Sequence, residues 1–330
     1  MRSRRLDNLP ARLLGGAVVV IVVALLVGEL IPKFASVANL SNVMVQASLL
    51  AVAAFGMTLV ILTGGIDLSV GGVMSLVGVI EASLVQAGAP WPLAIVAGLG
   101  VGLASGLLNA VIVSRLKLPP FIATFGTLGI AAGLALFVAD TVGRAVLPRD
   151  FVSLGNDGVA GVPYLVIIAL SLLVVLELVF RVTTWGVHLR ATGDNLAVAR
   201  LSGVPVARVL TSAYVASGLL AATAGTMLAA HLGTASPLQG EPFTLSAVAA
   251  CVIGGVDLFG GRGNLWAAGA GAVFLVSLRN ILNLLGVQPF MQDFVTGLLI
   301  ILAVLVTVQG PRLRDAARTV RLRTAGGRTA

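Results

Sequence analysis

Apolar runs of about 20 residues, separated by short polar or glycine-rich stretches, make up most of this sequence. Hydrophobic residues account for 58% of the chain and charged residues for 10%, whereas a soluble domain carries roughly 25% charged residues. A soluble core cannot hide so much apolar surface, but a lipid bilayer can, and a helix of this length crosses its hydrocarbon layer. The sequence therefore predicts an all-α polytopic membrane protein.

We expect about ten transmembrane helices, with both termini in the cytoplasm. The first run follows several arginines, lacks a small-residue cleavage site and is longer than a signal-peptide core, so we expect it to be retained. The transmembrane domain, 12–308, lies between an N-terminal tail, 1–11, and a basic C-terminal tail, 309–330. The expected spans are 12–31, 43–63, 67–86, 91–113, 119–140, 163–181, 209–230, 244–259, 265–285 and 289–308.

The distribution of lysine and arginine supports this topology through the positive-inside rule. If the N-terminus is cytoplasmic, 17 of the 21 basic residues fall in cytoplasmic segments, and a wrong helix count would scatter them. The other four are Lys33, Arg144, Arg149 and Arg279. Topology and attraction to anionic membrane lipid thus account for the net charge of +8, and nucleic-acid binding is not expected.

Few residues suit covalent chemistry or metal binding. The single Cys251 lies in an apolar run, and His188 and His231 are far apart in the sequence. No CxxC, HExxH or GxxxxGK[ST] pattern occurs, so we expect no metal site and no nucleotide-binding loop. We predict that the chain is not an enzyme, has no cofactor, and depends on another chain for any ATP hydrolysis.

The segment 61–72 places one carboxylate and four glycines between two apolar runs. A carboxylate in or beside hydrocarbon is costly and usually faces a polar path or the bundle interior. Glycines allow the backbone to turn and helices to approach closely. Asp67, with Gly64 and Gly65, is therefore a candidate for the cytoplasmic side of a translocation path. The alternative is that Asp67 only caps the following helix.

The pattern of this segment recurs later in the chain. Gly64-Gly-Ile-Asp67-Leu is echoed by Gly254-Gly-Val-Asp257-Leu, and a glycine pair follows each. The echo could mark duplicated halves, as in many transporters, or arise by chance in a glycine-rich chain. Asp257 is a second candidate for the path or its gate.

Three further charges, Glu81, Arg279 and Asp293, lie inside expected spans at similar depth below the outer face. Charges at one depth can pair, and unpaired charges are costly in a membrane. They could form an outer gate or contact a solute; alternatively, they form a structural ion pair or reach water by snorkelling. Amide side chains could likewise bind a solute or join helices, and the candidates are Gln46, Asn109, Asn280 and Asn283.

The cytoplasmic connection 182–208 carries the pattern of a short helix. Residues 193–195 have N-cap chemistry, residues 196–201 can form two turns, and Gly203 and Pro205 end the helix. Such a helix suits a groove on a partner protein. An ordinary interfacial helix in a long loop would have the same pattern.

Five segments together resemble the permease subunit of ribose-type ABC sugar importers, a family that also includes xylose, rhamnose and autoinducer-2 permeases. They occur in the family's order, and the first and third are the most specific. These segments are 56–71 (GMTLVILTGGIDLSVG), 120–128 (PFIATFGTL), 193–203 (GDNLAVARLSG), 254–263 (GGVDLFGGRG) and 278–286 (LRNILNLLG).

The resemblance implies a ten-helix permease that works as a pair, either two copies or two related chains. Its partners would be two cytoplasmic ATPase domains and an extracytoplasmic sugar-binding protein. Residues 193–203 match the family's coupling helix, which receives the stroke of the ATPase, although Asp194 stands where the family often has glycine. The candidate coupling residues are Gly193, Asp194, Asn195, Ala199, Arg200 and Gly203.

The loop 141–162 is the longest extracytoplasmic connection in this topology and carries Arg144 and Arg149. Charges at an interface orient the encounter with a partner, so these two arginines are candidates for docking the binding protein. Asp150 and Asp157 lie in the same loop and could instead neutralise them locally.

We therefore expect a permease subunit of a binding-protein-dependent ABC importer for a sugar or sugar-like solute, in the bacterial plasma membrane. The alternatives are an ion-coupled secondary transporter, with Asp67 or Asp257 as proton carrier, and a membrane-embedded enzyme. The scarcity of carboxylates within the spans and the coupling-helix pattern disfavour the first alternative. The second lacks a visible nucleophile–base or metal constellation.

Overall fold

The computed structural model describes residues 33–142, 147–299, 301, 302 and 305. Within them, six helical segments are long and apolar enough to cross a membrane. These are α2 (Val37–Leu62), α4 (Trp91–Ala110) continued by the π-helix η2 (Val111–Arg115), α5 (Pro120–Val142), α7 (Tyr164–Val182), α10 (Val206–Leu232) and α12 (Leu265–Leu284). Two shorter apolar helices are α3 (Val70–Gln86) and α11 (Glu241–Ile253), and residues 289–299 are also helical.

Each expected span that falls within the described residues coincides with a helix. The largest differences are at the start of α2, which begins at Val37 instead of residue 43, and at the end of α11, which lies at Ile253 instead of residue 259. α11 is the helix that falls short. It ends early because Gly255 has a φ of +90°, a conformation that glycine adopts readily and that stops a helix. The expected span 12–31 and the tails 1–11 and 309–330 lie outside the described residues.

The two long connections contain structure that the sequence did not reveal. The connection between α5 and α7 holds α6 (Arg149–Asn156) and a hairpin of β1 (Gly158–Val159) and β2 (Val162–Pro163), which pair antiparallel with Gly158 opposite Pro163. The other holds α8 (Trp185–Asp194) followed by α9 (Leu196–Leu201). Only α9 had been expected from the residue pattern.

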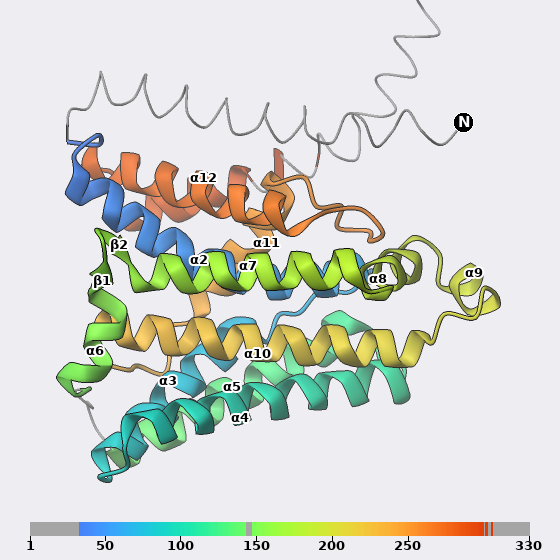
Figure 1. Ribbon diagram of the computed structural model, residues 1–330, viewed down its shortest axis with the longest axis horizontal. Coiled ribbons are helices and arrows are strands. Elements are labelled where there is room, and N and C mark those ends of the chain that lie inside the picture. Colours follow the sequence, from blue (N-terminus) through green and yellow to red (C-terminus); the bar gives the residue numbers. More distant parts are fainter. Residues whose placement is uncertain (1–32, 143–146, 300, 303–304, 306–330) are drawn as a thin grey trace, which may run out of the picture.

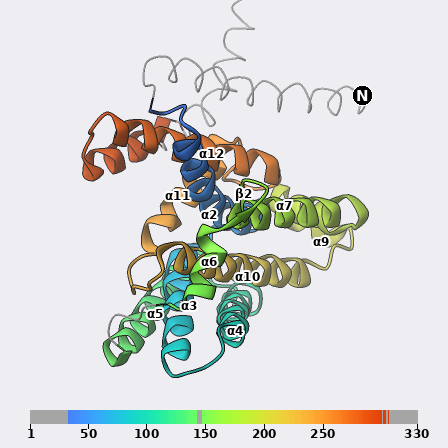
Figure 2. The ribbon, with the colours of Figure 1, turned by 60° about the vertical axis from the view of Figure 1, so that its left-hand side comes forward.

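The long helices lie side by side, with β1, β2 and α6 at one end of the bundle and α8 and α9 at the other (Figure 1). Figure 2 shows α2 and α10 between α12 on one side and α3, α4 and α5 on the other. α2 packs against α7, α10, α11 and α12, and 94% of its apolar stretch is buried. A helix that is apolar all round belongs in such a central position.

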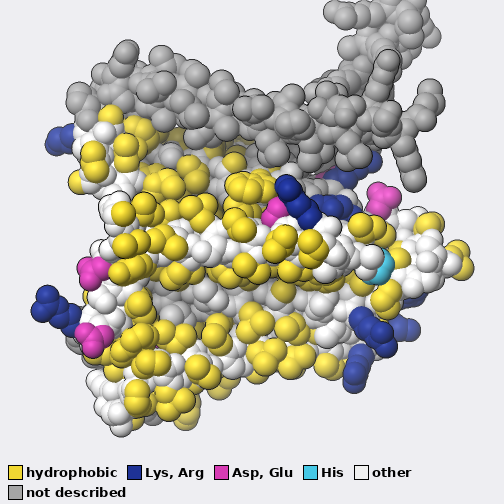
Figure 3. All heavy atoms as spheres, in the orientation of Figure 1, with side chains coloured by type: hydrophobic (Ala, Val, Ile, Leu, Met, Phe, Trp, Pro, Cys, Tyr) yellow, Lys and Arg dark blue, Asp and Glu magenta, His cyan; other side chains and the backbone are white. Residues whose placement is uncertain are grey.

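The outer helices leave much of their apolar surface uncovered. Only 28% of the spanning stretch is buried in each of α4, α5 and α7. Figure 3 shows hydrophobic side chains over the middle of one face, with the charged side chains mainly toward the two ends. This distribution is the one that a lipid bilayer requires of the surface it contacts.

Glycines let α4 and α10 pack backbone to backbone. A Cβ atom at Gly102 would overlap the carbonyl of Gly218, and one at Gly106 would lie 2.6 Å from the carbonyl oxygen of Tyr214. Small residues of this kind are what close helix contacts in membranes require. The contact fixes α4 against the middle of α10, beside the start of α3.

Candidate functional site

The short helix α9 is built as its residues predicted. The side-chain oxygen of Asn195 accepts hydrogen bonds from the amides of Ala197 and Val198, both at 3.0 Å, which is an N-cap. At the other end Gly203 has a φ of +80° and its amide donates to the carbonyl of Arg200 at 3.0 Å. The helix therefore has defined ends on both sides.

One face of α9 is anchored and the other is free. Ala199 is buried, whereas Arg200 and the apolar Leu196, Val198 and Leu201 are exposed, Leu201 to 89%. Beside this helix, η2 and the first turn of α10 enclose a hollow of about 480 Å³, whose lining includes Arg200 and Arg208. A protruding helix with exposed apolar and basic side chains is suited to dock into a partner.

The segment that leads into α9 packs directly onto the end of α2. A Cβ atom at Gly193 would overlap the carbonyl oxygen of Leu62, and the same oxygen accepts a hydrogen bond from the amide of Gly261 at 3.1 Å. A Cβ atom at Gly260 would lie 2.9 Å from the backbone of Gly64. Three glycine-rich segments that are distant in the sequence therefore meet here, and Asp194, next to Gly193, is exposed.

Asp67 is buried beside this junction, with an exposed fraction of 1%. Its Oδ1 accepts from the amide of Ser69 at 3.0 Å and from the hydroxyl of Ser69 at 2.5 Å, and its Oδ2 accepts from the hydroxyl of Ser217 at 2.7 Å. The side chain thus ties the start of α3 to the middle of α10. In this structure the buried carboxylate does not face an open path. It bonds the amide of Ser69, which is the N-cap residue of α3, but not the amide of Val70, so the capping alternative is met only in part.

The glycines before Asp67 shape a sharp turn. Gly64 has a φ of +84°, and a Cβ atom at Gly65 would lie 2.7 Å from the hydroxyl oxygen of Tyr214. That buried hydroxyl has no hydrogen-bond partner among the described residues. Gly64 and Gly65 therefore place the Asp67 turn against α10.

Asp257 lies in a similar turn that is not equivalent residue by residue. Both helices end with the same bond pattern, from Gly64 to the carbonyl of Ile61 in α2 and from Gly255 to that of Val252 in α11. The sequence echo, however, matches Gly64 with Gly254, one residue out of register. Asp257 bonds the amide of Phe259 at 3.1 Å and is only partly buried.

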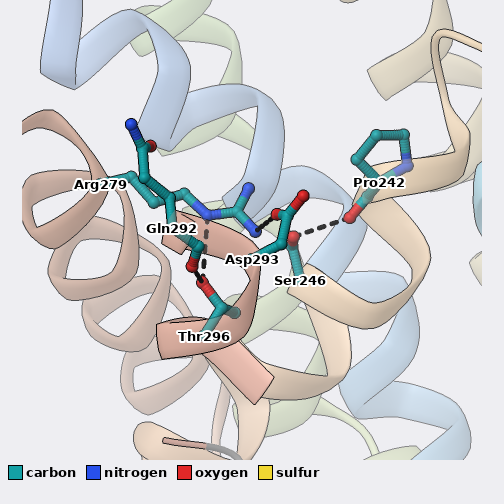
Figure 4. Close-up of polar contacts among 6 residues, drawn as sticks. All are labelled: Pro242, Ser246, Arg279, Gln292, Asp293 and Thr296. Atoms are coloured by element: carbon teal, nitrogen blue, oxygen red, sulfur yellow. Dashed lines mark hydrogen bonds and ion pairs between the residues drawn. The ribbon is translucent and has the colours of Figure 1, made fainter. Parts of the chain in front are cut away.

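Polar side chains gather at the opposite end of α2 and α12. Arg279 of α12 lies 3.3 Å from the carboxylate of Asp293 and 3.4 Å from the hydroxyl of Thr296, both on the helix 289–299 (Figure 4). The pair is accessible, since the two charged side chains are 30% and 75% exposed. Together with Gln46 and Ser246, Arg279 lines a cavity of about 90 Å³ between α2, α11 and α12.

Glu81 does not join this cluster. Its carboxylate is fully buried and accepts from the hydroxyl of Thr226 at 2.5 Å, while a Cβ atom at Gly98 would overlap it. The idea that Glu81 could pair with Arg279 and Asp293 is therefore wrong. Similar depth fixes the position of a residue along the membrane normal, but not the side of the bundle on which its helix lies.

Some of the remaining candidate residues join helices through hydrogen bonds, and others are exposed at the surface. Asn280 and Asn39 exchange two side-chain hydrogen bonds of 2.9 Å, which join α12 to α2, and Asn109 is buried in contact with Ser69. Asn283 and Arg149 are exposed, and Arg144 lies outside the described residues. Ser217 and Thr127 had not been singled out, although a polar residue within an apolar run is the signal that marks them.

Comparison with known proteins decides the class. The family profile described as "Branched-chain amino acid transport system / permease component" matches residues 39–304. The chain is 37% identical to the ribose import permease of Bacillus subtilis (strain 168), covering 86% of this chain and 89% of the relative. It is 36% identical to the autoinducer 2 import system permease of Escherichia coli (strain K12 / DH10B), covering 87% and 84%. The chain belongs to this family of ABC import permeases.

A fructose import permease of Rhizobium meliloti is also 36% identical, covering 83% of this chain and 79% of the relative. No solved structure matches the chain. Relatives of this kind are transport subunits of ABC importers, and this ABC permease is a multi-pass protein of the bacterial plasma membrane. The family favours the importer over the ion-coupled alternative.

Proposed function

We propose that this permease imports a sugar or sugar-like solute as one half of a pair, made with a second copy or a related chain. A cytoplasmic ATPase would dock at α9, and an extracytoplasmic sugar-binding protein would deliver the solute at the end formed by α6 and the hairpin. The names of its relatives, which import ribose, fructose and autoinducer 2, support the solute class.

The single observation that carries this proposal is that the two ends of the bundle differ in structure. A capped, protruding helix stands at one end, and an accessible polar cluster with a cavity lies toward the other. Basic side chains are exposed at the α9 end, namely Arg115, Lys117, Arg181, Arg200, Arg208 and Arg262. By the positive-inside rule this end is cytoplasmic, which agrees with ten helices and cytoplasmic termini.

The polar cluster supplies what hydroxylated solutes need. Arg279 offers donors, Asp293 offers acceptors, and Gln46 and Ser246 offer both. The two charges balance, so the cluster presents donors and acceptors without a net charge. Because the soluble binding protein would supply most of the affinity, the path itself needs only weak contacts.

At the outer end, Arg149 begins α6 and is exposed, next to the exposed Asp150. We assign Arg149, with Arg144, to the docking of the binding protein, where charges steer the encounter. At the inner end, we assign the turns of Asp67 and Asp257 to the contact region between the α9 segment and the end of α2.

Uptake by whole cells tests the proposal. A strain without its own ribose and fructose permeases would express this chain with an ATPase and a sugar-binding protein from the same genome, and would be given radiolabelled sugars. Uptake that requires all three proteins is the expected result. Uptake that persists without the ATPase and stops when the proton gradient is dissipated would support the ion-coupled alternative instead.

A further inference from the structure

A continuous chain of hydrogen bonds runs through the core of the bundle, and its donors converge on the carboxylate of Asp67 from two sides. The hydroxyl of Thr127 donates to the side-chain oxygen of Asn109 at 2.6 Å, and the amide of Asn109 donates to the hydroxyl oxygen of Ser69 at 2.9 Å. Ser69 donates to Asp67 at 2.5 Å, and Ser217 donates to Asp67 from the other side at 2.7 Å. All five side chains are 0–2% exposed.

The donors in this chain all point toward the carboxylate. Each hydroxyl has one proton to donate, and the side-chain amide of Asn109 presents its oxygen to Thr127 and its nitrogen to Ser69. Bonds aligned in one direction polarise one another, so the chain is stronger than its separate members. Removal of a member would leave its neighbours buried without a partner, which is costly inside the bundle.

These bonds join four elements that are far apart in the sequence. Thr127 belongs to α5, Asn109 to α4, Ser217 to α10, and Asp67 with Ser69 to the turn before α3. A second bond of 3.1 Å, from the hydroxyl of Thr124 to the carbonyl of Ile66, also holds α5 to that turn. The helices α4 and α5 are thus attached to the turn through specific polar contacts.

The same turn is the part of the bundle that the α9 segment reaches. Gly193, two residues before the N-cap of α9, contacts Leu62 at the end of α2, and Gly64 starts the turn that leads to Asp67. A displacement of α9 therefore acts on the end of α2 and, through the turn, on the hydrogen-bond chain.

We propose that the chain Thr127–Asn109–Ser69–Asp67–Ser217 is the joint that passes movement of α9 to α4, α5 and α10. Asn109 and Thr127 are then positioning residues for transport, acting through Asp67 without contacting the ATPase or the solute. This inference rests on the proposed docking of the ATPase at α9. A role limited to holding the fold would lower stability but would leave nucleotide-driven movement intact.

Distance measurements between spin labels test the joint. The labels would be placed on cysteines that replace the exposed Phe137 of α5 and Val174 of α7, in a Cys251→Ala background. The permease–ATPase complex in nanodiscs would be measured without nucleotide and with ATP and vanadate. We expect a nucleotide-dependent change in distance, its loss in Thr127→Val and Asn109→Leu, and its retention in Thr127→Ser, which keeps the hydroxyl.

Matched controls separate transmission from stability. Among the described residues, the hydroxyl of Thr223 in α10 bonds only its own helix, at 2.9 Å to the carbonyl of Leu219, so Thr223→Val removes a hydroxyl outside the chain. Thr223→Val should keep the distance change, and the double variant of Asn109 and Thr127 should lose no more than either single variant, because the two residues share one bond.

Three results would contradict the proposal that this chain transmits movement. They are a full nucleotide-dependent distance change in Thr127→Val, an equal loss of that change in Thr223→Val, or no distance change in the wild-type complex with its ATPase bound. Failure of the ATPase to co-purify with the wild-type permease would instead contradict the proposed docking. The two failures are therefore distinguishable.

Discussion

Gly193 lies so close to the carbonyl oxygen of Leu62 that a single added Cβ atom would overlap it. The atoms on both sides of this contact belong to the backbone, so neither can move aside as a flexible side chain would. We predict that Gly193→Ala lowers the free energy of unfolding by about 1–3 kcal/mol, the usual cost of overpacking. It should also reduce ATP-driven uptake, since the contact connects α9 to α2.

Gly100→Ala is the control for this prediction, because Gly100 lies within α4 and has open space around its Cα atom. A helical glycine with space gains helix propensity on replacement by alanine. Thermal unfolding in detergent should therefore show a loss of stability for Gly193→Ala only. Equal melting temperatures for the two variants would contradict the close contact.

Substitution of Asp67 separates its charge from its hydrogen bonds. Asp67→Ala leaves the donors of Ser69 and Ser217 buried without an acceptor, at about 1–3 kcal/mol for each unsatisfied group. Asp67→Asn keeps an acceptor for Ser69 and lets Ser217 turn to accept from the new amide, so it should fold nearly as well as the wild type. Because the proposed joint consists of these hydrogen bonds, we expect Asp67→Asn to keep much of the uptake and Asp67→Ala to lose it. An equal loss of uptake in both variants would show that transport needs the charge of Asp67 and would contradict a role through hydrogen bonds alone.

The pair Arg279–Asp293 should matter more for transport than for stability. Partly exposed ion pairs contribute about 0–1 kcal/mol, so Arg279→Gln and Asp293→Asn should change the melting temperature little. If the pair contacts the solute, each variant should reduce uptake while binding of the sugar-binding protein persists. Wild-type uptake in both variants would exclude the pair from the path and support a purely structural role.

The outer arginines are tested by association kinetics. Replacing both Arg144 and Arg149 by Glu should slow the association of the loaded binding protein and change the dependence of the rate on ionic strength. Surface plasmon resonance on the reconstituted permease at several salt concentrations measures both effects. Identical rates for the double variant and the wild type across salt would remove these arginines from the docking surface.

The helices and the α9 motif were accessible from the sequence because their causes are local. Apolar runs of membrane length predict spans, and the cap residues around Asn195 and Gly203 define α9 without reference to the rest of the chain. In contrast, α8 was missed because its residues are mixed in polarity and its support comes from other helices, namely α2, α7 and α10.

The partners of Asp67 could not be predicted for the same physical reason. Ser217 is 150 positions away in the sequence, and Asn109 reaches the carboxylate only through Ser69. Which face of α10 or α4 is turned inward depends on packing across several helices. The contact of Glu81 with Thr226 could not be predicted either, because the position of a residue along its helix does not specify which neighbouring helix its side chain faces.

In the proposed mechanism, ATP hydrolysis by a partner drives transport through α9, and substitution of Arg200 on this helix probes that coupling. Arg200→Glu reverses an exposed charge on this helix, and a bulky residue at Gly203 strains a backbone with a φ of +80°. Uptake of labelled sugar and release of phosphate would be measured together in proteoliposomes that contain the permease, the ATPase and the binding protein. We predict that both variants insert normally and continue to hydrolyse ATP, but transport far less sugar per ATP than the wild type. An unchanged ratio of sugar transported to ATP hydrolysed in both variants would contradict the account.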